Sequence, residues 1–350
     1  MKEKIQNEVI SSIFKNVEEC KIEALTGGLI NHSFKVSCNG KVVLLQKINQ
    51  RVFSSPQDVQ HNYLTLWHYA ESEMTGLRIP APFHFPGSKT LYTARNGSCW
   101  RAFEYIKNAY SYSMAARESQ AKNTAKAFAR FTAAFENFNP QQLKIVIPGF
   151  HDLSLRYRQF EEALKTEHYE RMNKALPLIE ELKKRERYKH FFEIIIESNE
   201  FLQRVMHHDA KISNVLFDNN NKVICPVDFD TVMPGYFFSD IGDMIRTISC
   251  SVDENSTDFK KITVRRKFYE ALMDGYLKLM KDSLTILEKR YIHFAGLMMT
   301  YMQSLRFLTD YLNGDVYYKV SYDEQNVDRA KNQLTLLIEL EKFLKKNYPD

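Results

Sequence analysis

The residues best suited to chemistry lie in one short stretch of the second half of the chain. The segment 207–214 reads His-His-Asp-Ala-Lys-Ile-Ser-Asn, and 227–230 reads Val-Asp-Phe-Asp. Asp209 is a carboxylate that can accept a proton, whereas Asn214 and Asp228 carry the hard oxygen atoms that Mg²⁺ prefers as ligands. Phosphoryl transfer needs such a base and such ligands, because it depends on positioning and charge stabilisation. The pattern predicts Asp209 as the catalytic base and Asn214 and Asp228 as metal ligands.

The spacing of these residues resembles that of the protein-kinase catalytic loop. In that loop an Asp precedes a metal-binding Asn by about five positions, and a second metal-binding Asp follows. Here Asn214 follows Asp209 at the same spacing, and Asp228 lies beyond a short predicted hairpin. Each piece alone is common in proteins, but the ordered set is much more specific.

A glycine pair near the N-terminus could serve the phosphates of a nucleotide. The segment 26–33 precedes a predicted strand, and its glycines would let backbone N–H groups approach phosphate oxygens closely, although a plain β-turn is the alternative. Lys47 is the only cation on the strand 44–48, and one residue of register decides whether Lys47 or Gln46 faces the phosphates. If the resemblance to kinases holds, the segment 100–106 is the hinge whose backbone pairs with adenine. The predicted nucleotide contacts are Gly27, Gly28, Asn31, Ser33, Lys47, Glu104 and Ile106.

Two kinds of element must position these residues. The dipeptides Asn39-Gly40 and Asn96-Gly97 separate β-prone runs and predict hairpins, and 56–72 has the apolar spacing of a helix. A small hairpin is predicted around the turn 218–221. Helical spacing recurs in 3–16, 114–137, 154–171, 174–200, 259–282, 284–313 and 324–346.

These elements predict an α+β, protein-kinase-like fold of two lobes. The first, 1–107, is a small antiparallel sheet with one inserted helix and would bind the nucleotide. The second, 108–350, is larger and mostly helical, and would hold the catalytic and substrate-binding residues.

The composition sets limits on partners and compartment. The formal net charge of +5 is mild for 350 residues, and the cations are scattered among acids, so no nucleic-acid surface is predicted. The five cysteines form no CxxC pair, which favours reduced thiols. The chain begins without the apolar core of a signal peptide and has no run of about 18 apolar residues, so we expect a cytoplasmic protein without a membrane span. The oligomeric state is left open.

Taken together, the motifs resemble the aminoglycoside phosphotransferase/choline kinase superfamily, and within it the N-acetylhexosamine 1-kinases most closely. The resemblance runs from about Lys21 to Lys331. It rests on the segments LTGGLINHSFKV, LLQKINQRVF, IPGFHD, HHDAKISNVLFD, PVDFDTVMPG, SDIGDMIR and RFLTDYLNGDVYYKV.

This resemblance implies an ATP- and Mg²⁺-dependent kinase whose product is a sugar 1-phosphate. Asp209 would then contact the acceptor as base, while Arg306 and Tyr317 would contact the sugar. Asp230 would point into the same cleft in a role left open. Without the resemblance, Arg306 and Tyr317 read as a helix-face arginine and a packed aromatic.

One departure from the protein-kinase pattern concerns the inserted helix, which offers no mid-helix Glu to pair with Lys47. Around the loop, His207 is expected to brace the backbone, and Asp240 and Asp243 to hold it. Arg246 could pair with one of these acids or reach the substrate.

Two other functions stay open at this level. A kinase for choline or an aminoglycoside would have an acidic or aromatic wall against its cationic acceptor, whereas Arg306 favours a neutral polyol. A catalytically silent nucleotide-binding regulator is disfavoured, because it would be free to lose Asp209.

Overall fold

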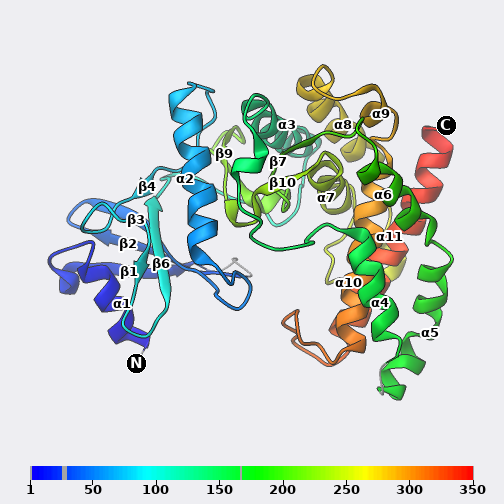
Figure 1. The fold of residues 1–350 in the computed structure, drawn as a ribbon, viewed down its shortest axis with the longest axis horizontal. Coiled ribbons are helices and arrows are strands. Elements are labelled where there is room, and N and C mark those ends of the chain that lie inside the picture. The colour runs from blue at the N-terminus through cyan, green and yellow to red at the C-terminus, as the bar shows by residue number, and fades with distance from the viewer. Residues whose placement is uncertain (1, 26–29, 166–167, 350) are drawn as a thin grey trace.

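The computed structural model describes residues 2–25, 30–165 and 168–349, with an antiparallel sheet in the N-terminal part and helices in the rest (Figure 1). Gly27 and Gly28, predicted to contact phosphates, lie outside the described residues. The α+β fold class predicted from the sequence is confirmed. Among the described residues, no helix is both long and apolar enough to cross a membrane.

The N-terminal sheet has six strands in the order β1-β2-β3-β6-β4, with β5 paired to β6. Asn39 and Gly40 both have positive φ, as a two-residue hairpin turn requires, so the predicted β2–β3 hairpin is confirmed. Two helices accompany the sheet, and α2 has the predicted bounds. The elements are α1 (Lys2–Ser11), β1 (Lys21–Leu25), β2 (His32–Cys38), β3 (Lys41–Lys47), α2 (Pro56–Ser72), β4 (Pro82–Phe83), β5 (Tyr92–Thr93) and β6 (Cys99–Glu104).

The C-terminal part packs helices around two small hydrogen-bonded strand pairs, β7–β10 and β8–β9. The β8–β9 pair is the hairpin predicted around 218–221. The elements of the C-terminal part are α3 (Glu118–Ala134), α4 (Leu153–Ala163), α5 (Tyr169–Lys183), α6 (Arg187–Glu197), β7 (Gln203–Met206), η3 (Ile212–Asn214), β8 (Val215–Phe217), β9 (Val223–Pro226), η4 (Phe229–Thr231), β10 (Met233–Tyr236), α7 (Phe238–Ile248), α8 (Arg266–Met280), α9 (Ile286–Arg290), α10 (Phe294–Leu312) and α11 (Gln325–Asn347).

Helix α7 was not predicted from the sequence. All its residues except Thr247 are buried, because it lies between α10 and α8. Its apolar residues follow the period of a helix, and its polar residues Asp240 and Asp243 are buried as well because they bond to the loop 207–208 and to Arg246. The predicted helical runs 174–200 and 284–313 are each divided in two by a short break.

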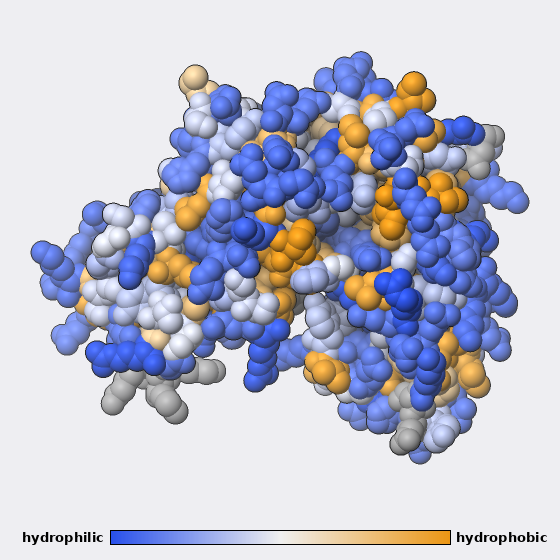
Figure 2. Space-filling view, viewed as in Figure 1, coloured by the Kyte–Doolittle hydropathy of each residue, from blue (hydrophilic) through white to orange (hydrophobic). Residues whose placement is uncertain are grey.

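A hydrophobic cluster joins the two parts of the molecule. It includes Tyr63 of α2, Phe103 of β6, Phe131 of α3 and Phe229 of η4. The rings of Tyr63 and Phe103 are 4.5 Å apart, and those of Tyr63 and Phe229 are 5.8 Å apart. Figure 2 shows the outline notched between the sheet side and the helical side, so the two parts meet over part of their facing surfaces.

The expectation that all five cysteines are reduced thiols is wrong for one pair. Cys20 and Cys38 form a disulfide, whereas Cys99, Cys225 and Cys250 are free and buried. The reason lies in the pairing of β1 with β2, which sets Lys21 opposite Ser37 and brings together two cysteines that are 18 residues apart in the sequence.

A tight contact between α7 and α10 can be tested by substitution. A Cβ at Gly242 would lie 2.4 Å from the backbone oxygen of Ala295 and 2.4 Å from Cγ of Met299. We expect Gly242→Ala to lower the free energy of unfolding by about 1–3 kcal/mol, since the backbone of α10 would have to move. Denaturant unfolding would measure this. Lys278→Ala, on an exposed position of α8, is the control, and equal midpoints for the two variants would contradict the packing described.

Candidate active site

The predicted catalytic loop, residues 207–214, is held by one buried carboxylate. Asp240 of α7 accepts hydrogen bonds from the backbone N–H groups of His207 (2.9 Å) and His208 (2.8 Å). The ring of His207 contacts the carbonyl oxygen of Val227 through Nε2 at 3.0 Å. Thr231 donates from its hydroxyl to the carbonyl of His207 at 2.7 Å. The expectations that His207 braces the loop and that Asp240 holds it are confirmed.

His208 sits in a left-handed backbone conformation next to Asp209. Its φ is +61°, which is unusual for a residue with a side chain. The ring fits only because residue 235 is glycine: a Cβ there would lie 2.4 Å from Cε1 of His208. Nδ1 of His208 lies 3.2 Å from Nδ1 of His151, which also contacts the Ser239 hydroxyl at 3.0 Å. The loop is thereby connected to the segment before α4. The sequence carried no signal that His208 would make this connection.

Asp209 faces a lysine that the sequence prediction passed over. Lys211 Nζ lies 2.9 Å from Oδ2 of Asp209, and the Asn214 amide donates to the same oxygen at 2.8 Å. Burial alone would raise the pKa of Asp209, but Lys211 and Asn214 outweigh it and hold that pKa below its usual value. Asp209 is therefore ionised and able to accept a proton. The signal in the sequence was a cation two positions after the predicted base.

Asp228 and Asn214 fit a divalent cation by their chemistry. Asn214 uses its amide nitrogen on Asp209, which leaves its carbonyl oxygen for a cation. Asp228 has a positive φ of +66°, and its side chain is partly open to solvent. Partial desolvation by the surrounding protein, followed by the nearby charges of Asp230 and Asp209, raises its pKa. A cation between these oxygens would relieve that repulsion.

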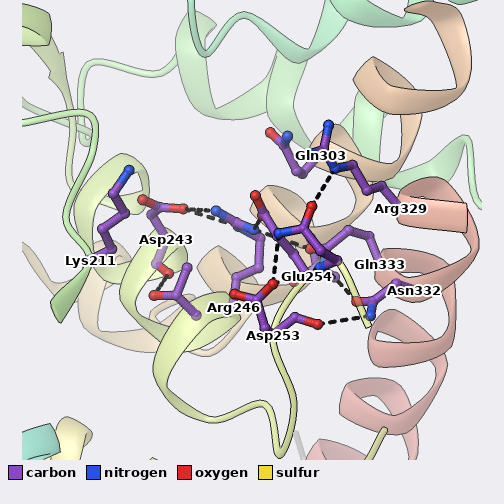
Figure 3. Close-up of polar contacts among 12 residues, drawn as sticks. Lys211, Asp243, Arg246, Asp253, Glu254, Gln303, Arg329, Asn332 and Gln333 are labelled. Atoms are coloured by element: carbon purple, nitrogen blue, oxygen red, sulfur yellow. Dashed lines mark hydrogen bonds and ion pairs between the residues drawn. The ribbon is translucent and has the colours of Figure 1, made fainter. Parts of the chain in front are cut away.

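Behind the loop, Asp243 lies between two cations, as Figure 3 shows, with Lys211 on one side and Arg246 on the other. Arg246 donates to Asp243 Oδ1 at 2.7 Å and to Glu254 at 2.6 Å. Of the two roles left open for Arg246, the structure shows the pairing with an acid, because Arg246 bonds to Asp243 and Glu254. Burial raises the pKa of Asp243, and Arg246 opposes that shift.

On the sheet side, Gln46 and not Lys47 lies on the face of β3 that carries Ser33 and Arg101. Gln46 accepts from Arg101 of β6 at 3.0 Å, and Arg101 forms a buried ion pair with Asp230. Lys47 points to the other face of β3, where its Nζ lies 6.0 Å from the Trp100 ring. Arg101 is the second residue that the sequence prediction missed, since an arginine in a strand carries no signal of the face it takes.

The other predicted nucleotide contacts are spread along this side. Asn31 donates to Asp230 at 2.5 Å, and Ser33 accepts from Gln46 at 3.0 Å. Glu104 forms an exposed ion pair with Arg78 at 2.6 Å and Ile106 is buried. Asn31 and Ser33 thus lie with Asp230, whereas Glu104 and Ile106 lie at the end of β6. Their contact with a nucleotide remains a prediction.

A second group of residues forms the wall beyond His208. The guanidinium of Arg306 on α10 lies 4.9 Å from the Phe150 ring and 5.9 Å from the Tyr317 ring. Phe150 in turn is 6.4 Å from the ring of His208, the neighbour of Asp209. Tyr317 is 57% exposed, so its ring is open to a ligand. The structure therefore brings Arg306 and Tyr317 together and connects them through Phe150 to His208.

The loop that carries Tyr317 is shaped by Asp310. This buried carboxylate accepts hydrogen bonds from the backbone N–H groups of Tyr317 (2.7 Å) and Tyr318 (2.8 Å) and from Asn326 (3.0 Å). The predicted alternative, a packed aromatic at 317, does not describe an exposed ring on a loop held in this way.

Arg306 has a second arginine beside it instead of an acid. Arg156 donates to the carbonyl of Phe150 at 3.1 Å, and its buried Nε has no partner among the described residues. Burial, followed by the charge of Arg306, lowers the pKa of Arg156 to about 10. Within the described residues, no carboxylate lies within ion-pair distance of either guanidinium, which makes this wall cationic.

Comparisons with known proteins agree with this arrangement. Residues 21–280 match the model of the phosphotransferase enzyme family. The fold is similar to that of a Plasmodium vivax ethanolamine kinase (TM-score 0.62, 14% identity, 95% of this chain and 87% of that one). It is also similar to a microcompartment-associated aminopropanol kinase (0.61, 13%, 98% and 98%). A spectinomycin phosphotransferase in complex with ADP and spectinomycin has a TM-score of 0.55 at 10% identity, with 92% and 93% covered.

The two hydrogen bonds that Asp240 accepts from the loop predict a pH effect on stability. Burial raises the pKa of Asp240 to about 7, so above its unfolded-state pKa the folded protein keeps a proton that the unfolded chain has lost. Its contribution is therefore greatest in acid and is lost as the pH rises through about 7. We expect Asp240→Asn to lose more stability relative to wild type near pH 5 than near pH 8, as denaturant unfolding at both pH values would show.

Asp274→Asn is the control for this experiment. Its hydrogen bond to Lys122 lowers the pKa of Asp274, so that carboxylate is ionised at both pH values. A loss for Asp240→Asn that does not change with pH would contradict the buried, raised-pKa carboxylate.

Proposed function

We propose that this chain, which belongs to the phosphotransferase enzyme family, transfers the γ-phosphoryl of ATP to the anomeric hydroxyl of an N-acetylhexosamine or a related sugar. Family membership makes it a small-molecule kinase of the aminoglycoside phosphotransferase and choline kinase type, acting on an alcohol group. The choice of a sugar is the further step, and it rests on the wall formed by Phe150, Arg306 and Tyr317.

The observation that carries the proposal is the set of Phe150, Arg306 and Tyr317, in which the Arg306 guanidinium forms no ion pair with a described carboxylate. Arg306 keeps donors free, since its one hydrogen bond to a described residue goes to Gln303 at 3.2 Å. An aromatic ring and a guanidinium suit a sugar, because the ring packs on its C–H face and the guanidinium donates to hydroxyl or acetamido oxygens. The segment RFLTDYLNGDVYYKV, which holds Arg306 and Tyr317, is also the part that resembles the hexosamine kinases.

The same wall disfavours a cationic acceptor. The fold relatives include kinases of ethanolamine and aminopropanol, whose amino groups are cations at neutral pH. An ammonium group placed here would lie near Arg306 and Arg156, and like charges in a partly buried site repel strongly. A neutral polyol meets no such penalty.

In the proposed mechanism, Asp209 acts on the acceptor hydroxyl. Its carboxylate, ionised beside Lys211, accepts the proton as the hydroxyl oxygen forms its bond to the γ-phosphorus and ADP leaves. Lys211 then stabilises negative charge at the same place. Asp240 and His207 keep the loop fixed, so that Asp209 does not have to be ordered during the reaction.

Asn214 and Asp228 would hold Mg²⁺, which supplies positive charge to the phosphates when bound. Both offer oxygen atoms, one from an amide and one from a carboxylate. Asp228 should matter more, since a carboxylate adds charge to the bond and an amide adds only a dipole.

The role of Asp209 can be tested by replacing its carboxylate with an amide. Asp209→Asn keeps the shape of the loop but cannot accept the proton, and we expect kcat to fall by about 10²–10⁴-fold with nucleotide binding retained. Steady-state kinetics and ADP titration calorimetry would measure the two quantities. Retention of more than roughly a tenth of the activity would remove Asp209 as the base.

The acceptor wall predicts a selective loss in Arg306→Ala. We expect kcat/KM for the sugar to fall by about 2–4 kcal/mol of transition-state binding, with the KM for ATP unchanged, because a charged hydrogen-bond donor is removed. Arg266→Ala is the matched control: Arg266 is an exposed arginine of α8 that pairs with Glu270 at 2.7 Å.

The acceptor itself is identified by assaying N-acetylhexosamines, hexoses, choline, ethanolamine and kanamycin side by side. Phosphorus NMR of the product should show the phosphate coupled to the anomeric proton. Phosphate on the 6-hydroxyl, or turnover of the amines with none of the sugars, would overturn the sugar 1-kinase proposal and leave the kinase assignment.

A further inference from the structure

A buried ion pair connects the sheet to the segment that follows Asp228. Arg101 of β6 is 2% exposed and Asp230 of η4 is 4% exposed, and the guanidinium bonds to Oδ1 of the carboxylate. The ring of Phe103 lies 4.9 Å from the guanidinium. Both charges are out of water, so each depends on the other to offset the cost of burial.

The pair is extended on the sheet side by a row of polar side chains. Strand register places Ser33, Gln46 and Arg101 next to each other across β2, β3 and β6. Gln46 accepts from Nε (3.2 Å) and Nη2 (3.0 Å) of Arg101 and donates to the Ser33 hydroxyl (3.0 Å). The guanidinium is therefore fixed in plane by two neighbours.

Asp230 also holds the start of β2. Its second oxygen accepts from the Asn31 amide at 2.5 Å, and Asn31 accepts from the backbone N–H of Asn49 at 2.9 Å. Asn31 and Ser33 belong to the segment 26–33 that the sequence predicts for phosphate binding. One carboxylate, two residues after the predicted metal ligand Asp228, thus bonds to Arg101 at one end of the row and to Asn31, two residues before Ser33 at the other end.

Protein kinases position the phosphates with a lysine of the third strand paired to a helix glutamate. This chain has Gln46 on the corresponding face, and α2 meets η4 and the residue after it with uncharged side chains: Tyr63 packs on Phe229, and Asn62 donates to the Val232 carbonyl. The charged groups that meet at this interface come from β6 and η4 instead.

We propose that Arg101 and Asp230 form the positioning ion pair of this kinase, in place of a lysine–glutamate pair. The pair sets Asn31, on the sheet side, against the predicted metal ligand Asp228, so that a Mg²⁺–nucleotide would meet both at once. The inference rests on the proposed function. Neither residue is a catalytic group, since both act through the residues that they hold.

The test separates positioning from packing by comparing nucleotide binding with stability. Arg101→Met should lower the Tm and weaken the binding of ADP with Mg²⁺ in titration calorimetry by roughly ten- to a hundredfold. Arg204→Met is the matched control, because Arg204 also pairs with a buried carboxylate. That carboxylate is Glu288, which lies on α9 and is far from Asp228 in the sequence. Arg204→Met should lower the Tm and leave ADP binding unchanged.

A double variant keeps the question answerable if Arg101→Met does not fold. Arg101→Met with Asp230→Leu replaces both charges by apolar side chains, an exchange that often restores stability. We expect its Tm to return toward that of wild type while ADP binding and the KM for ATP stay impaired and the KM for the acceptor changes little. Arg101→Lys, which keeps the charge but not the forked geometry, should show the same defect in milder form.

Three results would overturn the inference. Recovery of both Tm and ADP binding in the double variant would make the pair a packing element. An altered Mg²⁺ requirement in Asp230→Asn with none in Arg101→Met would make Asp230 a metal ligand. A wild-type protein that neither binds ADP nor phosphorylates any acceptor would overturn the proposed function and this inference with it, whereas the first two results leave the proposed function intact.

Discussion

The acceptance of two backbone N–H groups by Asp240 is the interaction on which the rest of the site depends. It fixes His207 and His208 and hence the direction in which Asp209 leaves the loop. Its geometry requires α7 to be buried between neighbouring helices, which in turn requires Gly242 at the contact with α10. A helix buried in the core thereby supplies a carboxylate to the backbone N–H groups of His207 and His208. A change in the packing of this helix would therefore also change the loop that carries Asp209.

From this anchor, order extends in two directions. Towards the helical part, His208 contacts His151, and the adjacent Phe150 lies under Arg306. Towards the sheet, η4 carries Asp230 to Arg101 and Asn31. The residues proposed as base, metal ligands and acceptor wall come from separate elements, yet each is at most a few contacts away from the same short segment.

Much of this was accessible from the sequence because it rests on local signals. The turn at Asn39-Gly40 and the helix 56–72 follow from backbone preferences, and the order of Asp209, Asn214 and Asp228 follows from the chemistry. What was not accessible depends on contacts between distant segments. The face taken by Arg101 depends on strand register, the burial of the polar residues of α7 depends on which helices pack around it, and the Cys20–Cys38 disulfide requires knowing that β1 pairs with β2.

The fit of the His208 ring against Gly235 has an evolutionary consequence. A left-handed backbone at 208 is open to glycine without strain, and glycine there would leave the space in front of residue 235 empty. In homologues the two positions should then vary together: a large side chain at the position of 208 demands glycine at that of 235, and only after 208 has become small can 235 acquire a side chain. The order of these two changes is fixed by steric exclusion, so lineages with side chains at both positions should be missing.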